Sequence, residues 1–86
     1  MTYTHYCWGK MLNGEIQRGM YSRSQGAATP DIARLLAKPI GKDCDAYALL
    51  RVETTDQIFR GEVSRRLLTE TVLEIILGAA LERTDR

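Results

Sequence analysis

The sequence predicts an α+β domain in which helices pack on one face of an antiparallel sheet of three or four strands. Three observations support this fold class: an Asn13-Gly14 pair between two half-apolar runs, alternation of apolar residues over 45–53, and helical spacing of apolar residues from residue 70 onward. In chain order we expect a β-hairpin, a short helix, a strand or second hairpin, and a long C-terminal helix. With 86 residues, of which 44% are hydrophobic, the chain is expected to form a single compact domain over 1–86.

The N-terminal hairpin is predicted to consist of strands 3–12 and 15–23. Asn-Gly supplies the two positive-φ residues that a type I′ turn requires, and a two-residue turn fixes the register of the strands. The expected cross-strand pairs are Met11 with Ile16, Cys7 with Met20, Trp8 with Gly19, and Tyr6 with Tyr21.

The two faces of this hairpin differ in chemistry. Cys7, Met11, Ile16 and Met20 form an apolar face that is typical of a core, whereas the opposite face is aromatic and basic. The second face has three interpretations: a protein contact surface, a platform that stacks unpaired bases, or a second core surface buried under a helix. The residues assigned to partner binding are Tyr6, Trp8, Lys10, Gln17, Tyr21 and Arg23, together with Arg60, Arg65 and Arg66 ahead of the last helix.

Residues 30–38 are predicted to form a short helix, because Thr29 can cap its first turn and Pro30 suits the first helical position. Its buried stripe is expected to be Ile32, Leu35 and Leu36, and Pro39 is expected to end it.

The alternation over 45–53 predicts a strand with Ala46, Ala48, Leu50 and Val52 on one side. Residues 57–63 have the β-branched and aromatic content of a return strand, although Gly61 weakens that assignment.

The long C-terminal helix is predicted over Glu70–Arg83. At about 100° per residue its apolar side chains would cover about two-thirds of the circumference, more than a surface helix needs. Such a helix is either central to the domain or uses its surplus apolar face to bind a second copy or another partner. The residues assigned to dimerisation are Leu73, Ile76, Leu77 and Ala80.

Candidate metal ligands are few and widely spaced. His5 and Cys7 would share a strand face and could recruit Cys44 with Asp43 or Asp45, but structural zinc sites are typically built from tighter pairs. We therefore expect packing cysteines and no metal or other cofactor. His5 and Cys7 side chains would also run side by side instead of pointing at each other, and no glycine-rich phosphate loop is present, so we expect no catalytic residues and no enzyme.

The net charge of +1 provides no long-range field for attracting nucleic acid, an anionic membrane or an acidic substrate. The first residues do not have the pattern of a secretory signal, and no apolar run approaches the about 20 residues of a membrane span. These features predict a cytoplasmic protein with no membrane partner and with reduced cysteines.

The sequence therefore predicts a non-catalytic protein-protein interaction module that binds and modulates, by inhibition, a larger assembly, and that can dimerise through its C-terminal helix. In size and architecture it resembles the phage-encoded inhibitors of host defence complexes such as anti-CRISPR proteins. The alternative is a small nucleic-acid-binding domain that uses the aromatic-basic hairpin face, and a third interpretation is a metal-stabilised fold.

Overall fold

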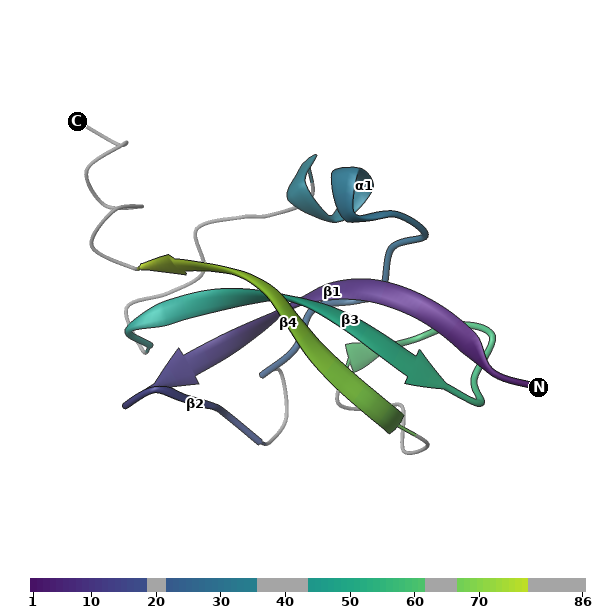
Figure 1. The fold of residues 1–86 in the computed structure, drawn as a ribbon, viewed down its shortest axis with the longest axis horizontal. Coiled ribbons are helices and arrows are strands. Elements are labelled where there is room, and N and C mark those ends of the chain that lie inside the picture. Colours follow the sequence, from purple (N-terminus) through teal and green to yellow (C-terminus); the bar gives the residue numbers. More distant parts are fainter. Residues whose placement is uncertain (19–21, 36–43, 62–66, 78–86) are drawn as a thin grey trace.

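A curled antiparallel sheet of four strands forms most of the structure, which is a computed structural model describing residues 1–18, 22–35, 44–61 and 67–77 (Figure 1). The strand order is β2-β1-β3-β4, and one short helix lies on the outer side of the sheet. The elements are β1 (Tyr3–Leu12), β2 (Glu15–Ile16), α1 (Pro30–Leu35), β3 (Ala46–Thr54) and β4 (Leu67–Leu77). The domain is mostly β, so the predicted α+β class is wrong.

The Asn13-Gly14 turn forms as predicted. The φ angles of these residues are 53° and 79°, and Met11 pairs with Ile16. The Asn13 N–H also donates to Asp45 Oδ2 at 3.0 Å, which ties the turn to the start of β3.

The register set by this turn ends just after β2, at Gln17, whose N–H donates to the Lys10 carbonyl at 2.8 Å. Gly9 would pair with Arg18 if it continued, and it pairs with Arg23 instead. Tyr6 likewise pairs with Ala27 and not with Tyr21. Both partners lie later in the chain than the register of the turn requires. The other two expected pairs involve Gly19 and Met20, which lie outside the described residues.

Residues 67–77 form strand β4 and not the first part of a long helix. β4 pairs with β3 along its length, and a register shift between Leu49 and Leu50 makes Leu73 an extra, bulged residue. The bulge places Val72 and Ile75 on one face of the sheet although they are three residues apart. This spacing imitates a helical pattern, which is why the prediction of a helix was wrong; residues 78–86 lie outside the described part of the chain.

A loop, and not a return strand, follows β3. Thr54 Oγ1 accepts a hydrogen bond from Asp56 N–H and donates one to the Asp56 carbonyl, both at 2.9 Å, which closes a tight turn. Gly26 N–H donates to the Phe59 carbonyl at 2.9 Å and fixes the loop against the segment that follows the hairpin. Phe59 is thereby buried, and the predicted strand over 57–63 is wrong for its described residues.

Helix α1 begins as predicted, with Ile32 N–H donating to Thr29 Oγ1 at 3.2 Å. Its buried residue is Ala33, whereas Ile32 and Leu35 are exposed, so the predicted apolar stripe is wrong at both described positions. Leu36 and the rest of the expected helix lie outside the described residues.

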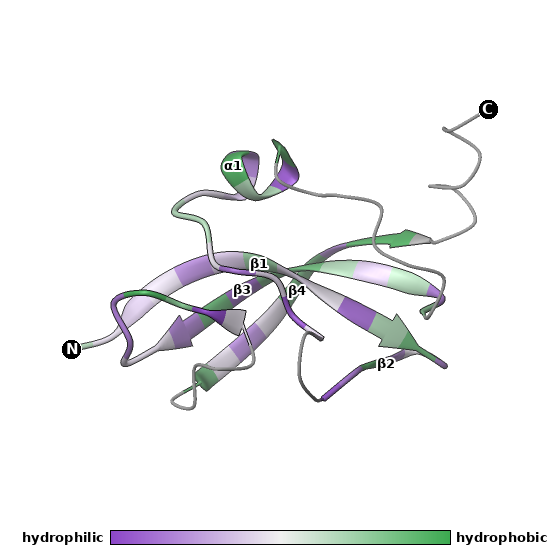
Figure 2. Ribbon diagram, turned by 180° about the vertical axis from the view of Figure 1, so that it is seen from behind, coloured by the Kyte–Doolittle hydropathy of each residue, from purple (hydrophilic) through white to green (hydrophobic). Residues whose placement is uncertain are grey.

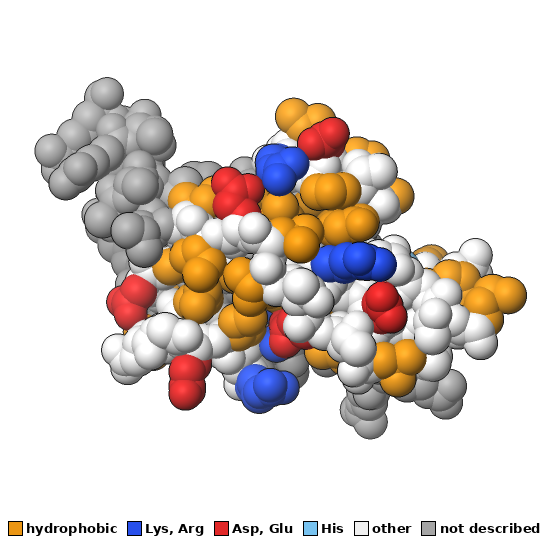
Figure 3. Space-filling view, viewed as in Figure 1, with side chains coloured by type: hydrophobic (Ala, Val, Ile, Leu, Met, Phe, Trp, Pro, Cys, Tyr) orange, Lys and Arg blue, Asp and Glu red, His pale blue; other side chains and the backbone are white. Residues whose placement is uncertain are grey.

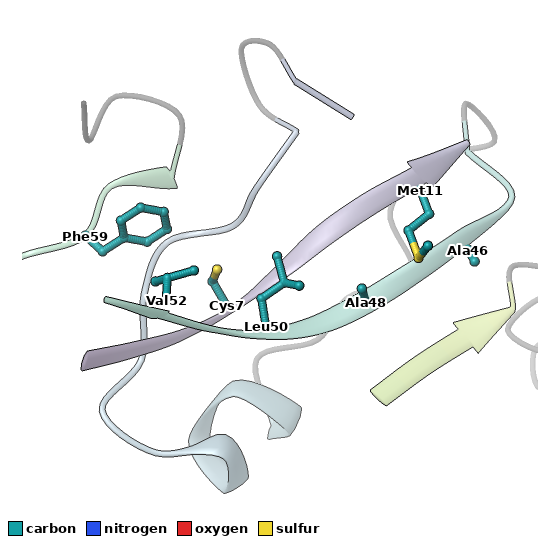
Figure 4. Packing of buried hydrophobic residues seen from close by; sticks show 7 residues of the cluster. All are labelled: Cys7, Met11, Ala46, Ala48, Leu50, Val52 and Phe59. Atoms are coloured by element: carbon teal, nitrogen blue, oxygen red, sulfur yellow. The ribbon is translucent and has the colours of Figure 1, made fainter. Parts of the chain in front are cut away.

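Both faces of β3 are buried over its first five residues, 46–50, and each face belongs to a separate hydrophobic cluster. The inner cluster lies on the concave side of the sheet (Figure 4). The outer cluster lies under α1, a helix that contains both hydrophobic and hydrophilic residues (Figure 2). The inner cluster contains Cys7, Met11, Ala46, Ala48, Leu50, Val52 and Phe59, and the outer one contains Trp8, Ala27, Ala33, Tyr47 and Leu49.

Candidate functional site

Trp8, the centre of the predicted hairpin contact face, lies in the core. Its side chain is 5% exposed, and its Nε1 donates a hydrogen bond to the Ala33 carbonyl of α1 at 2.7 Å. Tyr6 packs half-buried against the same cluster. The structure therefore places these rings under the helix, which is the core interpretation that the sequence left open.

Arg23 forms a structural ion pair. Its Nε and Nη2 atoms donate to the two carboxylate oxygens of Glu70 at 2.7 and 3.1 Å, and Nη1 donates to the Gln17 carbonyl at 3.2 Å. The Arg23 side chain is 4% exposed, so the guanidinium is buried against the sheet and paired with Glu70. Among the other residues assigned to partner binding, Lys10 and Gln17 are half-buried, Arg60 is exposed, and Tyr21, Arg65 and Arg66 lie outside the described residues.

The candidate metal ligands are not brought together. The His5 ring stacks on Phe59, and its Nε2 lies 3.0 Å from the Asp56 carbonyl. Cys7 belongs to the inner cluster and Cys44 packs against the outer one, so the sheet separates the two thiols. Over the described ranges no group of three or more His, Cys, Asp or Glu side chains could hold a metal ion.

The outer edge of β4 is an open edge of the described sheet. Across the described residues β4 pairs with β3 alone, although it is 11 residues long. Figure 3 shows hydrophobic side chains gathered over β4 and the adjoining part of the sheet. Four apolar residues of this strand are between 43 and 54% exposed: Leu68, Val72, Leu73 and Ile75.

The hydrogen bonds of β1 show which backbone groups of β4 point outward. Tyr6 N–H donates to the Ala27 carbonyl and Lys10 N–H donates to the Ser22 carbonyl. The even-numbered residues of β1 therefore turn their backbone N–H and C=O groups away from β3. In antiparallel strands the backbone groups of successive residues alternate between the two neighbours. The odd-numbered residues of β1 therefore face β3.

The same alternation passes through β3 to β4. Ala48 and Leu50 pair with the odd-numbered residues Gly9 and Cys7, so they turn their backbone groups to β1. The alternate residues of β3, Tyr47 and Leu49, therefore turn theirs to β4. Residues of β4 that oppose Ala46, Ala48, Leu50 and Val52 then turn theirs to the open edge. These outward-facing residues are Glu70, Val72, Ile75 and Leu77.

A groove of about 470 Å³ adjoins this edge, between β4 and the β1–β2 hairpin. Met11, Ile16 and Val72 are its apolar lining, and Glu15, Arg18 and Glu70 are its charged lining. The exposed side of β4 thus continues into the concave side of the sheet.

Three predicted dimerisation residues, Leu73, Ile76 and Leu77, lie on β4, although not on a helix. Leu73 is the exposed bulge residue, and Ile76 is half-buried against the outer cluster. Leu77 ends the strand, and Ala80 lies outside the described residues. Sequence reasoning missed the edge itself, which five β-branched residues in an 11-residue run could have indicated: Thr69, Thr71, Val72, Ile75 and Ile76.

Most arginines in the described part of the chain are paired with carboxylates. Arg34 contacts Asp31 at 3.0 Å and Glu74 at 3.3 Å, and Arg51 lies 3.5 Å from Glu53. These ion pairs reduce the positive potential that a phosphate backbone would meet.

No helix in the described ranges is long and apolar enough to cross a bilayer. Comparisons with protein-family models, with characterised proteins and with solved structures gave no match.

Proposed function

We propose that this chain is a non-catalytic protein-binding domain that associates by adding a strand to the open edge of β4. The observation that carries this proposal is the unpaired outer edge of β4, with exposed Val72 and Ile75 beside outward-facing backbone groups. Binding to and inhibition of a larger assembly remains the proposed role, and its contact surface moves from the hairpin face to β4.

The composition of β4 supports this surface. Natural edge strands avoid pairing with other chains by carrying charged residues, especially lysine, or proline, by a β-bulge, by being very short, or by being covered. Of these devices β4 has a bulge at Leu73 and two glutamates that are paired with arginines of their own chain, but it contains no lysine, arginine or proline, and among the described residues nothing covers its outer edge. Strand addition uses such an edge, with main-chain hydrogen bonds giving affinity and alternate side chains giving specificity.

Nucleic-acid binding by the hairpin face has less support. Trp8 is buried under α1 and Arg23 is paired with Glu70, so neither presents a stacking ring or a free guanidinium to a base.

The proposal is tested with two substitutions at one position. Ile75→Pro removes an outward N–H that β3 does not use, whereas Ile75→Thr keeps that N–H and loses at least as much apolar surface. The wild-type chain and both variants are immobilised, and the proteins that bind to each of them are compared. An untagged copy of this chain is added as one of the proteins that can bind.

We expect proteins retained by wild type and by Ile75→Thr to be lost from Ile75→Pro. Equal retention by Ile75→Pro would show that binding does not use the β4 edge, and would overturn the proposal. Circular dichroism and cooperative unfolding of each variant check that the fold is intact.

A further inference from the structure

We infer that the strand added to β4 is β4 of a second copy, in an antiparallel pair around a two-fold axis. This inference rests on the proposed function and names its partner. The two four-stranded sheets would then join into one continuous sheet, through the same surface patch on each copy.

The outward-facing residues of β4 select one register for this pair. Glu70, Val72, Ile75 and Leu77 are symmetric about the midpoint between Leu73 and Glu74. An antiparallel pair centred there places Val72 opposite Ile75 of the second copy, and Glu70 opposite Leu77 of the second copy. It is the register in which each of the four outward-facing residues meets another outward-facing residue, so each can exchange backbone hydrogen bonds.

The side chains agree with this register. Val72 and Ile75 lie on the concave face, are partly exposed, and would form two apolar cross-strand pairs beside the two-fold axis. The bulge at Leu73 makes this possible, because without it these residues would project from opposite faces.

The backbone disfavours the alternative register centred on Val72. With Val72 opposite Val72 of the second copy, Glu70 would lie opposite Glu74 of that copy, whose backbone groups turn to β3, so this pair could not exchange hydrogen bonds. Glu70 and Glu74 are moreover neutralised within their own chain, by Arg23 and Arg34, so the edge can be buried without an unpaired carboxylate.

Sedimentation of the purified chain between about 1 and 100 µM is the first test. We expect a dimer for wild type and for Ile75→Thr, and a dimer dissociation constant raised by about tenfold or more for Ile75→Pro. Val72→Pro removes another outward N–H and serves as the second variant if Ile75→Pro does not fold.

A register-specific disulfide is the second test, in a Cys44→Ser background that leaves Cys7 buried. Val72→Cys combined with Ile75→Cys should form a covalent dimer on oxidation, with residue 72 linked to residue 75 of the other copy. Val72→Cys alone is the control, because the two copies of residue 72 would lie about 10 Å apart, beyond the reach of a disulfide.

The results separate the two proposals. A strictly monomeric wild type overturns the second copy as the partner, while loss of retained proteins from Ile75→Pro would still support strand addition to another protein. A dimer that persists unchanged in Ile75→Pro, or a covalent dimer without the 72–75 link, overturns the inferred pair.

Discussion

Arg23 and Glu70 join the two outer edges of the sheet through a bidentate ion pair of 2.7 and 3.1 Å. Arg23 pairs with Gly9 on the outer side of β1, and Glu70 belongs to β4, so β1 and β3 lie between them. In a flat sheet with a strand spacing of about 4.8 Å these positions would be about 14 Å apart. The ion pair therefore depends on the curl of the sheet and holds its two edges together across the concave face.

Glu70→Ala is expected to lower the free energy of unfolding by about 2–3 kcal/mol, because it leaves the buried Arg23 guanidinium without its carboxylate. Urea denaturation at fixed protein concentration measures the change. Arg34→Ala is the matched control, since it removes exposed ion pairs and should cost less than about 1 kcal/mol. Similar losses in both variants would contradict a structural role for the Arg23–Glu70 pair.

Trp8→Phe is expected to cost about 1–3 kcal/mol, because the Ala33 carbonyl loses its buried donor and a smaller ring fills the space. Trp8 is the one tryptophan in the chain, so the variant has no tryptophan fluorescence. Unfolding is therefore measured by circular dichroism. Leu35→Ala, at an exposed position on the same helix, should change stability by less than about 0.5 kcal/mol. If Trp8→Phe were as mild as Leu35→Ala, the indole would not be fastening α1 to the sheet.

Gly61→Ala is expected to destabilise the domain more than Gly14→Ala. Both residues have positive φ, which costs a side chain about 1–2 kcal/mol. A Cβ at Gly61 would also lie 2.6 Å from the Arg23 carbonyl oxygen, whereas a Cβ at Gly14 would meet nothing within 4 Å. Thermal unfolding of the two variants compares them, and equal melting temperatures would show that the loop does not pack tightly against Arg23.

Thiol labelling should distinguish the two cysteines. Cys44 is half-buried and Cys7 is fully buried in the inner cluster, so we expect a thiol reagent to modify Cys44 first in the native protein and both residues in denaturant. Cys44→Ser identifies the rapid phase by removing it. Rapid labelling of Cys7 in that variant would mean that the inner cluster opens readily.

Local interactions made several elements readable from the sequence. The positive φ angles of Asn13 and Gly14, the cap at Thr29 and the alternation along β3 each depend on a few neighbouring residues. These elements form where the sequence predicts them, and the first pairs of the hairpin take the predicted register.

The candidate site was only partly predictable. The sequence indicated an exposed apolar surface near Leu73 and Ile76, and the structure shows Leu73 exposed, but on an edge strand. The aromatic hairpin face could not be assigned to core or surface, because the burial of Trp8 depends on where α1 lies.

The turn and the helix start follow from the sequence alone, since backbone preferences and hydrogen bonds between near neighbours set their conformations. The alternation of β3 was predictable too, although its hydrogen-bonded partners in β1 and β4 are distant in the chain. Tertiary structure decided the state of residues 67–77, whose apolar spacing fits a helix and whose β-branched content fits a strand. Pairing with β3 satisfies the backbone groups that β3 turns to that side, and the bulge at Leu73 reconciles the spacing with a strand. Both effects come from a partner far away in the sequence, so neither residue pattern nor local propensity could choose between the two states.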